Sequence, residues 1–105
     1  MKIYRFIYKN KKVKIDDFEC TEIPNCGLYC VEKYYNGYGN KLIHKEDLNI
    51  IKPNYKYIMW SLNKDDINSF IEQIIDYKNS TMTSLIRQIK SIKTEIGILE
   101  NNKLG

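Results

Sequence analysis

The spacing of apolar residues changes from two to three or four near residue 62, and this change constrains the fold more than any other feature. Before it, stretches such as "KIYRFIYK" and "YKYIMWSL" show the period-two patterns and aromatic content of strands. After it, apolar residues recur at helical spacing. We therefore expect an α+β protein that forms one domain. An antiparallel sheet of four to five strands over residues 1–62 would precede one long or two consecutive helices over residues 63–101.

Turn-forming residues separate the expected strands. Asn10 and Lys11 lie where a tight hairpin belongs, residues 24–27 follow the second strand, and residues 36–37 precede the fourth. The segment "KLIHKEDLNII" is ambiguous, with a short strand followed by a helical turn as one interpretation. The first strand is apolar or aromatic on both faces. This favours a strand that its own chain covers on one face and that meets an interface on the other.

The helical half has a clear beginning. Asn63 followed three residues later by Asp66 resembles a capping box, and Asp65 and Asp66 complement the positive end of the helix dipole. Farther on, the polar residues 79–81 are weak helix formers, so we predict a break or kink there. The alternative is an exposed stretch of one long helix.

Apolar residues of the C-terminal half fit a single heptad frame, which Lys78 interrupts. Twenty helical residues would form a rod of about 30 Å, which is longer than a small sheet can cover. We therefore expect the exposed surface to meet the same helix of another copy, giving a homo-oligomer. The alternative is that a second helix folds back onto the first. The heptad residues are Ile75, Met82, Leu85, Ile89, Ile92, Ile96 and Leu99.

The charge balance argues against nucleic acid as the partner. The 105 residues carry 17 basic and 13 acidic side chains, for a net charge of +4, and only Arg5 and Arg87 are arginines. A lysine-rich sequence without alanine is typical of AT-rich genomes, so the basic excess needs no anionic partner. No apolar run is long enough to span a membrane, and the first residues do not resemble a signal peptide. We expect a cytoplasmic protein without a membrane partner.

The residues that usually carry catalysis or bind metals are few. Cys20, Cys26 and Cys30 are odd in number and lack close Cys-x-x-Cys pairs, which indicates free thiols rather than a zinc site. His44, the only histidine, lies among lysines and acidic residues as a surface residue would. No nucleophile or phosphate-loop motif is present. We expect no catalytic residues, no metal and no cofactor, and hence a protein that is not an enzyme.

The layout of a charged N-terminal hairpin, further strands, "MWSLNKDDINSFIEQII" and a heptad tail resembles small proteins of phages and prophages of low-GC Gram-positive bacteria. Among these, it is similar to the Thoeris anti-defence family of nucleotide sponges. That resemblance implies an N-terminal antiparallel sheet with C-terminal helices, dimers or larger oligomers, and capture of cyclic ADP-ribose-type signals or cyclic oligonucleotides. The family uses an aromatic residue, an asparagine and an arginine, which makes Trp60, Asn63 and Arg87 the ligand-binding candidates here.

The leading hypothesis is thus a phage or prophage protein that sequesters a cyclic nucleotide signal in the cytoplasm of the infected host. Its pocket would lie at the subunit interface, where Trp60 or a tyrosine stacks on a base. Arg87, expected beside the heptad seam, would hold phosphates together with lysines and the helix N-terminal amides. Trp60 as a core residue and Arg87 in an inter-helix salt bridge are the competing interpretations. Two other functions remain open: an anti-CRISPR-like inhibitor that binds a host effector protein, through the basic hairpin at residues 9–14 or an acidic patch, and a coiled-coil adaptor without ligand.

Overall fold

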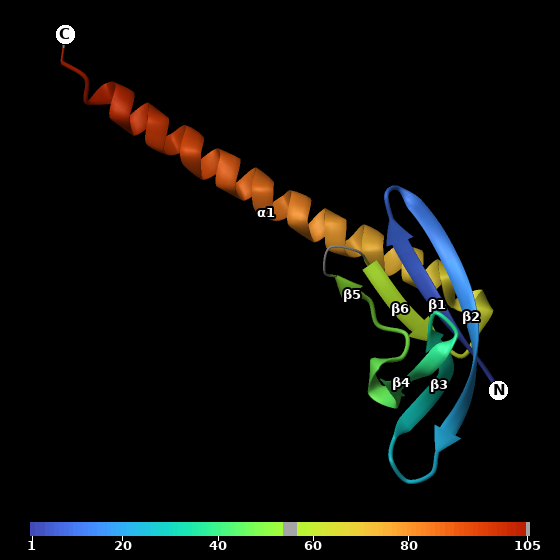
Figure 1. Ribbon diagram of the computed structural model, residues 1–105. Helices are drawn as coiled ribbons and strands as arrows, with labels where there is room; N and C mark the ends of the chain where they lie inside the picture. The colour runs from blue at the N-terminus through green and yellow to red at the C-terminus, as the bar shows by residue number, and fades with distance from the viewer. Residues whose placement is uncertain (54–56, 105) are drawn as a thin grey trace. The chain divides into compact units, whose positions relative to one another are not determined.

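The computed structural model describes residues 1–53 and 57–104 and consists of two units, residues 1–74 and residues 75–105. It confirms the predicted α+β class, with an antiparallel sheet followed by one long helix (Figure 1). The sequence pattern places the change from sheet to helix at residue 62, but the first unit extends to Ile74. The strands are β1 (Lys2–Lys9), β2 (Lys12–Ile23), β3 (Leu28–Tyr35), β4 (Tyr38–His44), β5 (Lys52–Pro53) and β6 (Tyr57–Ser61); 3₁₀ turns span Lys45–Asp47 and Lys64–Asp66, and the helix α1 spans Ile67–Asn101.

The strands of the described residues form one sheet in the order β4-β3-β2-β1-β6-β5, and all neighbouring strands are antiparallel. The long strand β2 belongs to two pairings. Its first part, up to Glu19, pairs with β1, and its last part, from Cys20 onward, pairs with β3. Figure 1 shows the curve of β2 as it passes from one partner to the other. This strand therefore connects the β1–β6 part of the sheet to the β3–β4 hairpin.

The predicted turns are confirmed. Asn10 and Lys11 have φ angles of 54° and 61°, the left-handed pair that a two-residue hairpin requires. Asn36 and Gly37 repeat this geometry between β3 and β4, with φ angles of 52° and 85°. The ambiguous segment continues β4 to His44 and then forms the 3₁₀ turn. Of the last predicted strand, residues 55–56 lie outside the described residues, and β6 begins at Tyr57.

Two hydrophobic clusters cover the two faces of β1. Met59 and Trp60 are neighbours on β6 yet belong to different clusters, because successive side chains of a strand point to opposite faces. Both faces are thus covered within one chain, and the expectation that one face of β1 meets an interface is wrong. One cluster contains Ile3, Cys20, Tyr29, Val31, Ile43 and Trp60. The other contains Phe6, Met59, Phe70 and Ile74, so the first turns of α1 complete the core of the first unit.

The helix begins with a modified cap. The Asn63 side chain caps the helical turn, but it accepts from the backbone N–H of Asp65, at 2.9 Å, and not from that of Asp66 as a capping box would. Asp66 does not reach back to the Asn63 N–H as a capping box requires. Instead, the Ser61 hydroxyl accepts from that N–H at 3.0 Å and donates to Asp66 Oδ2 at 2.5 Å. The Ser61 hydroxyl therefore links the Asn63 N–H to the Asp66 carboxylate. Because this hydroxyl forms hydrogen bonds inside the protein, Ser61 can be almost completely buried.

The second unit is helical as far as Asn101, and α1 runs through residues 79–81 without interruption. The predicted break is wrong. The hydroxyl groups of Thr81 and Thr83 donate to the carbonyl oxygens of Tyr77 and Asn79 at 3.1 Å and 3.0 Å, so these polar side chains form hydrogen bonds inside the helix. Because α1 is a single helix, the alternative of a second helix folding back onto the first is also wrong. Among the described residues, no helix is long and apolar enough to cross a membrane.

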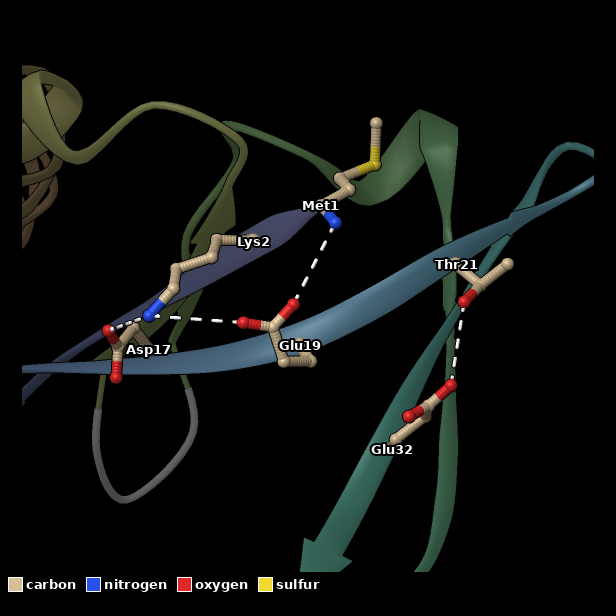
Figure 2. A network of polar contacts seen from close by, with 6 residues as sticks. All are labelled: Met1, Lys2, Asp17, Glu19, Thr21 and Glu32. Atoms are coloured by element: carbon tan, nitrogen blue, oxygen red, sulfur yellow. Dashed lines mark hydrogen bonds and ion pairs between the residues drawn. The ribbon is translucent and has the colours of Figure 1, made fainter.

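A polar network joins the start of β1 to β2 (Figure 2). Lys2 Nζ lies 2.9 Å from Asp17 Oδ2 and 4.0 Å from Glu19 Oε1, and the terminal amino group lies 3.7 Å from Glu19 Oε2. The hydrogen bond to Asp17 raises the pKa of Lys2, and the same bond lowers the pKa of Asp17. Both side chains are more than half exposed, so water weakens their attraction.

Replacing Lys2 by methionine is expected to raise the pKa of Asp17 toward the ordinary carboxyl value. In the native protein the folded-state pKa of Asp17 lies below its unfolded value. The pair therefore stabilises the fold above the ordinary aspartate pKa, and this stabilisation is lost as pH falls through the lowered value. An NMR titration of the Asp17 carboxyl carbon measures the change. An identical Asp17 titration in Lys2→Met and wild type would refute the assignment.

Candidate functional site

Arg5 lies at the centre of the candidate site because of its position in the strand register. It is directly opposite Asp16 on β2 and directly opposite Trp60 on β6. Side chains of directly opposed residues share a face of the sheet. The Arg5 Nη2 atom lies 2.6 Å from Asp16 Oδ2, and each side chain is only about one-fifth exposed. A charged pair thus occupies the middle of a largely apolar face.

A β-bulge brings Tyr34 to the same face. Tyr29 and Val31 of β3 point into the cluster that contains Trp60, and simple alternation would place Lys33 next. The register between β3 and β4 shifts between Glu32 and Tyr35, and Lys33 has a φ angle of 53°. This extra residue reverses the alternation, so Tyr34 packs against the cluster in place of Lys33.

Three aromatic rings surround the Arg5 guanidinium. Its Cζ atom lies 5.2 Å from the Phe18 ring centroid, 5.3 Å from that of Tyr34 and 5.9 Å from that of Trp60. The Trp60 ring lies 5.8 Å from both other rings. These are distances at which cation–π attraction is effective. Packing from several sides therefore restrains both the cation and the rings.

Both terminal nitrogen atoms of the Arg5 guanidinium donate hydrogen bonds. Nη1 donates to Tyr34 Oη at 2.8 Å, in addition to the bond from Nη2 to Asp16, whereas the buried Nε has no hydrogen-bond partner among the residues that the structure describes. Burial lowers the pKa of Arg5, but the bonds to Asp16 and Tyr34 outweigh it and raise the pKa above its ordinary value. Arg5 therefore remains charged and acts chiefly as an anchor that holds Tyr34 in position.

A pocket of about 260 Å³ opens beside this cluster. Tyr34 and Trp60 form part of its wall, and Lys41 holds its ammonium group 5.3 Å from the Tyr34 ring centroid. On another side, Lys52 pairs with Asp47 at 3.0 Å. The remaining lining comes from Leu42, Ile43 and Ile58, which gives the pocket a mostly apolar surface. A ligand with a flat ring and a negative group suits this combination.

A second hollow, of about 420 Å³, also includes Tyr34. Its lining combines Arg5 and Lys33 with Asp16 and Asp17 and therefore contains charges of both signs. Arg5 and Asp16 already bind each other, and Asp17 binds Lys2. This hollow has less apolar surface than the first.

The structure separates the three residues that the sequence analysis selected. Trp60 is a core residue, 7 % exposed, that also contributes to the pocket wall. Asn63 uses its side chain in the helix cap. The helix start packs in the cluster of Phe70, not in that of Trp60, so the expected pairing of the Trp60 ring with helix N-terminal amides is wrong.

Arg87 lies in the second unit, on the exposed part of α1. It is two residues from both Leu85 and Ile89, which is the outward position of the heptad. The expectation that Arg87 lies beside the seam is therefore wrong, since only positions adjacent to the seam reach across to a partner helix.

Sequence reasoning missed Arg5, Tyr34 and Lys41. The sequence does indicate that Arg5 is unusual, because it is the one charged residue between Ile3 and Ile7 on an otherwise apolar face of a strand. Tyr34 carried no comparable signal, since its orientation depends on the bulge. Lys41 is one of many lysines, and only the fold distinguishes it.

The three cysteines are free, with Cys20 buried, Cys30 half-buried and Cys26 exposed. Burial raises the pKa of the Cys20 thiol, so it remains protonated at neutral pH. No group of three or more metal-binding side chains occurs in the described part of the chain. No family model matches the sequence, and no curated protein or solved structure is significantly similar to it.

Proposed function

We propose that this protein is a non-enzymatic, self-associating phage or prophage protein that captures a small cyclic nucleotide signal and thereby suppresses bacterial immunity. The signal would be of the cyclic ADP-ribose type or a cyclic oligonucleotide. The observation that supports this proposal is the pocket in which Tyr34 and Trp60 lie beside Lys41. Rings that stack on a base and a cation that binds phosphate are the two elements that nucleotide capture requires.

Each group has a distinct part in the proposed complex. Tyr34 provides the stacking surface for a base, and Arg5 holds this ring through its bond to the phenol oxygen. Lys41, a lining residue of the pocket, binds phosphate, and Lys52 adds a second cation that Asp47 partly neutralises. Trp60 forms part of the pocket wall and is held there by its packing in the core.

The size of the pocket limits what one copy can enclose. Its volume of about 260 Å³ is below the roughly 300–1,000 Å³ of typical ligand sites. One copy would thus enclose one base and its phosphate, and the rest of a cyclic dinucleotide-sized molecule would extend beyond the pocket. Contacts from a second subunit would complete the enclosure.

The test is calorimetric titration of the purified protein with cyclic ADP-ribose isomers, cyclic dinucleotides and cyclic trinucleotides, with linear mononucleotides as controls. We expect Lys41→Met to weaken binding about tenfold, the effect of one charge-assisted hydrogen bond. Lys45→Met is the matched control, because Lys45 also faces a tyrosine ring, that of Tyr29 at 5.5 Å, but does not line the pocket. It should bind as wild type does.

Two results would contradict the proposal. One is the absence of binding to every cyclic nucleotide tested. The other is equal loss of affinity in Lys41→Met and Lys45→Met, which would show that general charge and not the pocket determines binding. Mass spectrometry of small molecules released by heating protein from cells with an active defence pathway identifies the natural ligand.

A further inference from the structure

The second unit presents a continuous apolar stripe on α1. Met82, Ile89 and Ile96 occupy one heptad position, and Leu85, Ile92 and Leu99 occupy another, and each of these side chains is about half exposed or more. Contiguous apolar patches larger than a few hundred Å² are uncommon on monomeric soluble proteins. A second copy of this helix supplies a covering surface of the same kind.

A parallel pairing of two copies places like charges together. In register, Lys78 would face Lys78 of the second copy within the seam. Glu95 of each copy would also lie beside Glu100 of the other copy, so two carboxylate pairs would face each other across the helix pair. The parallel arrangement thus brings repulsion both into the seam and along its edges.

An antiparallel pairing removes these contacts and uses the whole stripe. When Ile89 of one copy faces Ile92 of the other, every apolar seam residue from Met82 to Leu99 meets an apolar partner. Lys78 then lies beyond the paired section, because its opposite position falls after the helix ends at Asn101. The core pairs are Met82 with Leu99, Leu85 with Ile96, and Ile89 with Ile92.

The edges of the antiparallel pair are also compatible. Lys93 lies beside Ile86 of the second copy, whose exposed side chain widens the apolar stripe. Gln88 lies beside Glu95 of the second copy, so an amide faces each carboxylate. Like charges do not face each other at these edge positions.

We propose that two copies of this chain associate through the stripe as an antiparallel helix pair, with Ile89 opposite Ile92. The inference rests on the self-association included in the proposed function and adds its surface, orientation and register. The paired sections run in opposite directions, so Met82 of each copy lies at the end of the pair where Leu99 of the other copy lies.

The surface is tested by analytical ultracentrifugation of full-length variants. Ile92→Glu places a charge in the seam and is expected to weaken association at least 100-fold. Ile98→Glu is the matched control, because Ile98 is 56 % exposed and Ile92 is 55 % exposed, but Ile98 points away from the seam. It should associate as wild type does. A monomeric wild type, or equal weakening by both substitutions, would overturn the proposal.

The orientation is tested by disulfide cross-linking in a background without the three natural cysteines, after circular dichroism confirms that this background folds. Met82→Cys and Leu99→Cys chains are equilibrated together under reducing conditions and then oxidised. The antiparallel pair predicts a mixed dimer whose disulfide joins position 82 of one chain to position 99 of the other. Two copies of position 82 would then be about 25 Å apart along the axis, far beyond disulfide reach.

Dimers of Met82→Cys with itself would indicate a parallel pair and overturn the proposal, as would a failure to cross-link in a sample that sediments as a dimer. The ligand and the helix pairing have separate readouts. Correct cross-linking without nucleotide binding would refute only the proposed ligand. Nucleotide binding with the wrong cross-links would refute only the orientation.

Discussion

Replacing Phe70 by alanine is expected to lower the free energy of unfolding by about 3–5 kcal/mol, the range for removal of a fully buried aromatic ring. Phe70 has no exposed surface, and its ring lies 5.7 Å from that of Phe6 on β1. Met59 and Ile74 complete the same cluster. The substitution leaves a cavity between the sheet and the first turns of α1 that the surrounding side chains cannot fill without moving.

Chemical denaturation at a fixed protein concentration measures this loss, because self-association makes apparent stability depend on concentration. Tyr38→Ala is the matched control, since it also removes an aromatic ring but from a side chain that is 80 % exposed. We expect it to cost less than about 1 kcal/mol. If Phe70→Ala were as mild as the control, α1 would not belong to the core of the first unit.

Replacing Arg5 by methionine is expected to destabilise the fold by about 2 kcal/mol, because breaking a fully buried pair costs about 3–5 kcal/mol and partial access of water to this pair reduces the cost. The substitution leaves the Asp16 carboxylate, which is 21 % exposed, without the guanidinium that lies 2.6 Å away. Tyr34 also loses its hydrogen bond, so its ring should become more mobile.

Lys2→Met is the matched control for Arg5→Met, because it makes the same change of charge on the same strand at an exposed pair. Its effect on the unfolding free energy should be clearly smaller. The double variant with Asp16→Asn should lose less stability than the sum of the two single variants, since neither a guanidinium nor a carboxylate then remains at this partly buried position. Additive effects, or equal losses in Arg5→Met and Lys2→Met, would show that Arg5 and Asp16 do not act as a pair.

Local chemistry explains why much of the fold follows from the sequence. The left-handed turns at Asn10 and Asn36 need residues that tolerate positive φ, and those residues were present. Alternation along β1 correctly places Ile3 and Phe6 on opposite faces. These features depend on neighbouring residues, so short patterns are sufficient to predict them.

The errors arose where residue propensity and simple alternation do not determine the outcome. The orientation of Tyr34 depends on a bulge whose left-handed residue is Lys33, a type that seldom signals such a conformation. The helix continues through Thr81, whose hydroxyl donates to the carbonyl oxygen of Tyr77, although propensity alone favours a break there. Trp60 was predicted to bind the ligand and does line the pocket. The residue directly opposite it is Arg5, which lies 55 positions earlier in the sequence and was not predicted as a site residue.

The pairing of Arg5 with Trp60 has a consequence for the order of folding. The hairpins β1–β2 and β3–β4 join residues that are close in the chain, whereas β6 must return from far along it to reach β1. Closing that long loop costs more entropy than forming either hairpin. The aromatic pocket, whose wall includes Trp60, therefore becomes complete only at this late step. A nascent chain acquires it only after β6 has emerged from the ribosome.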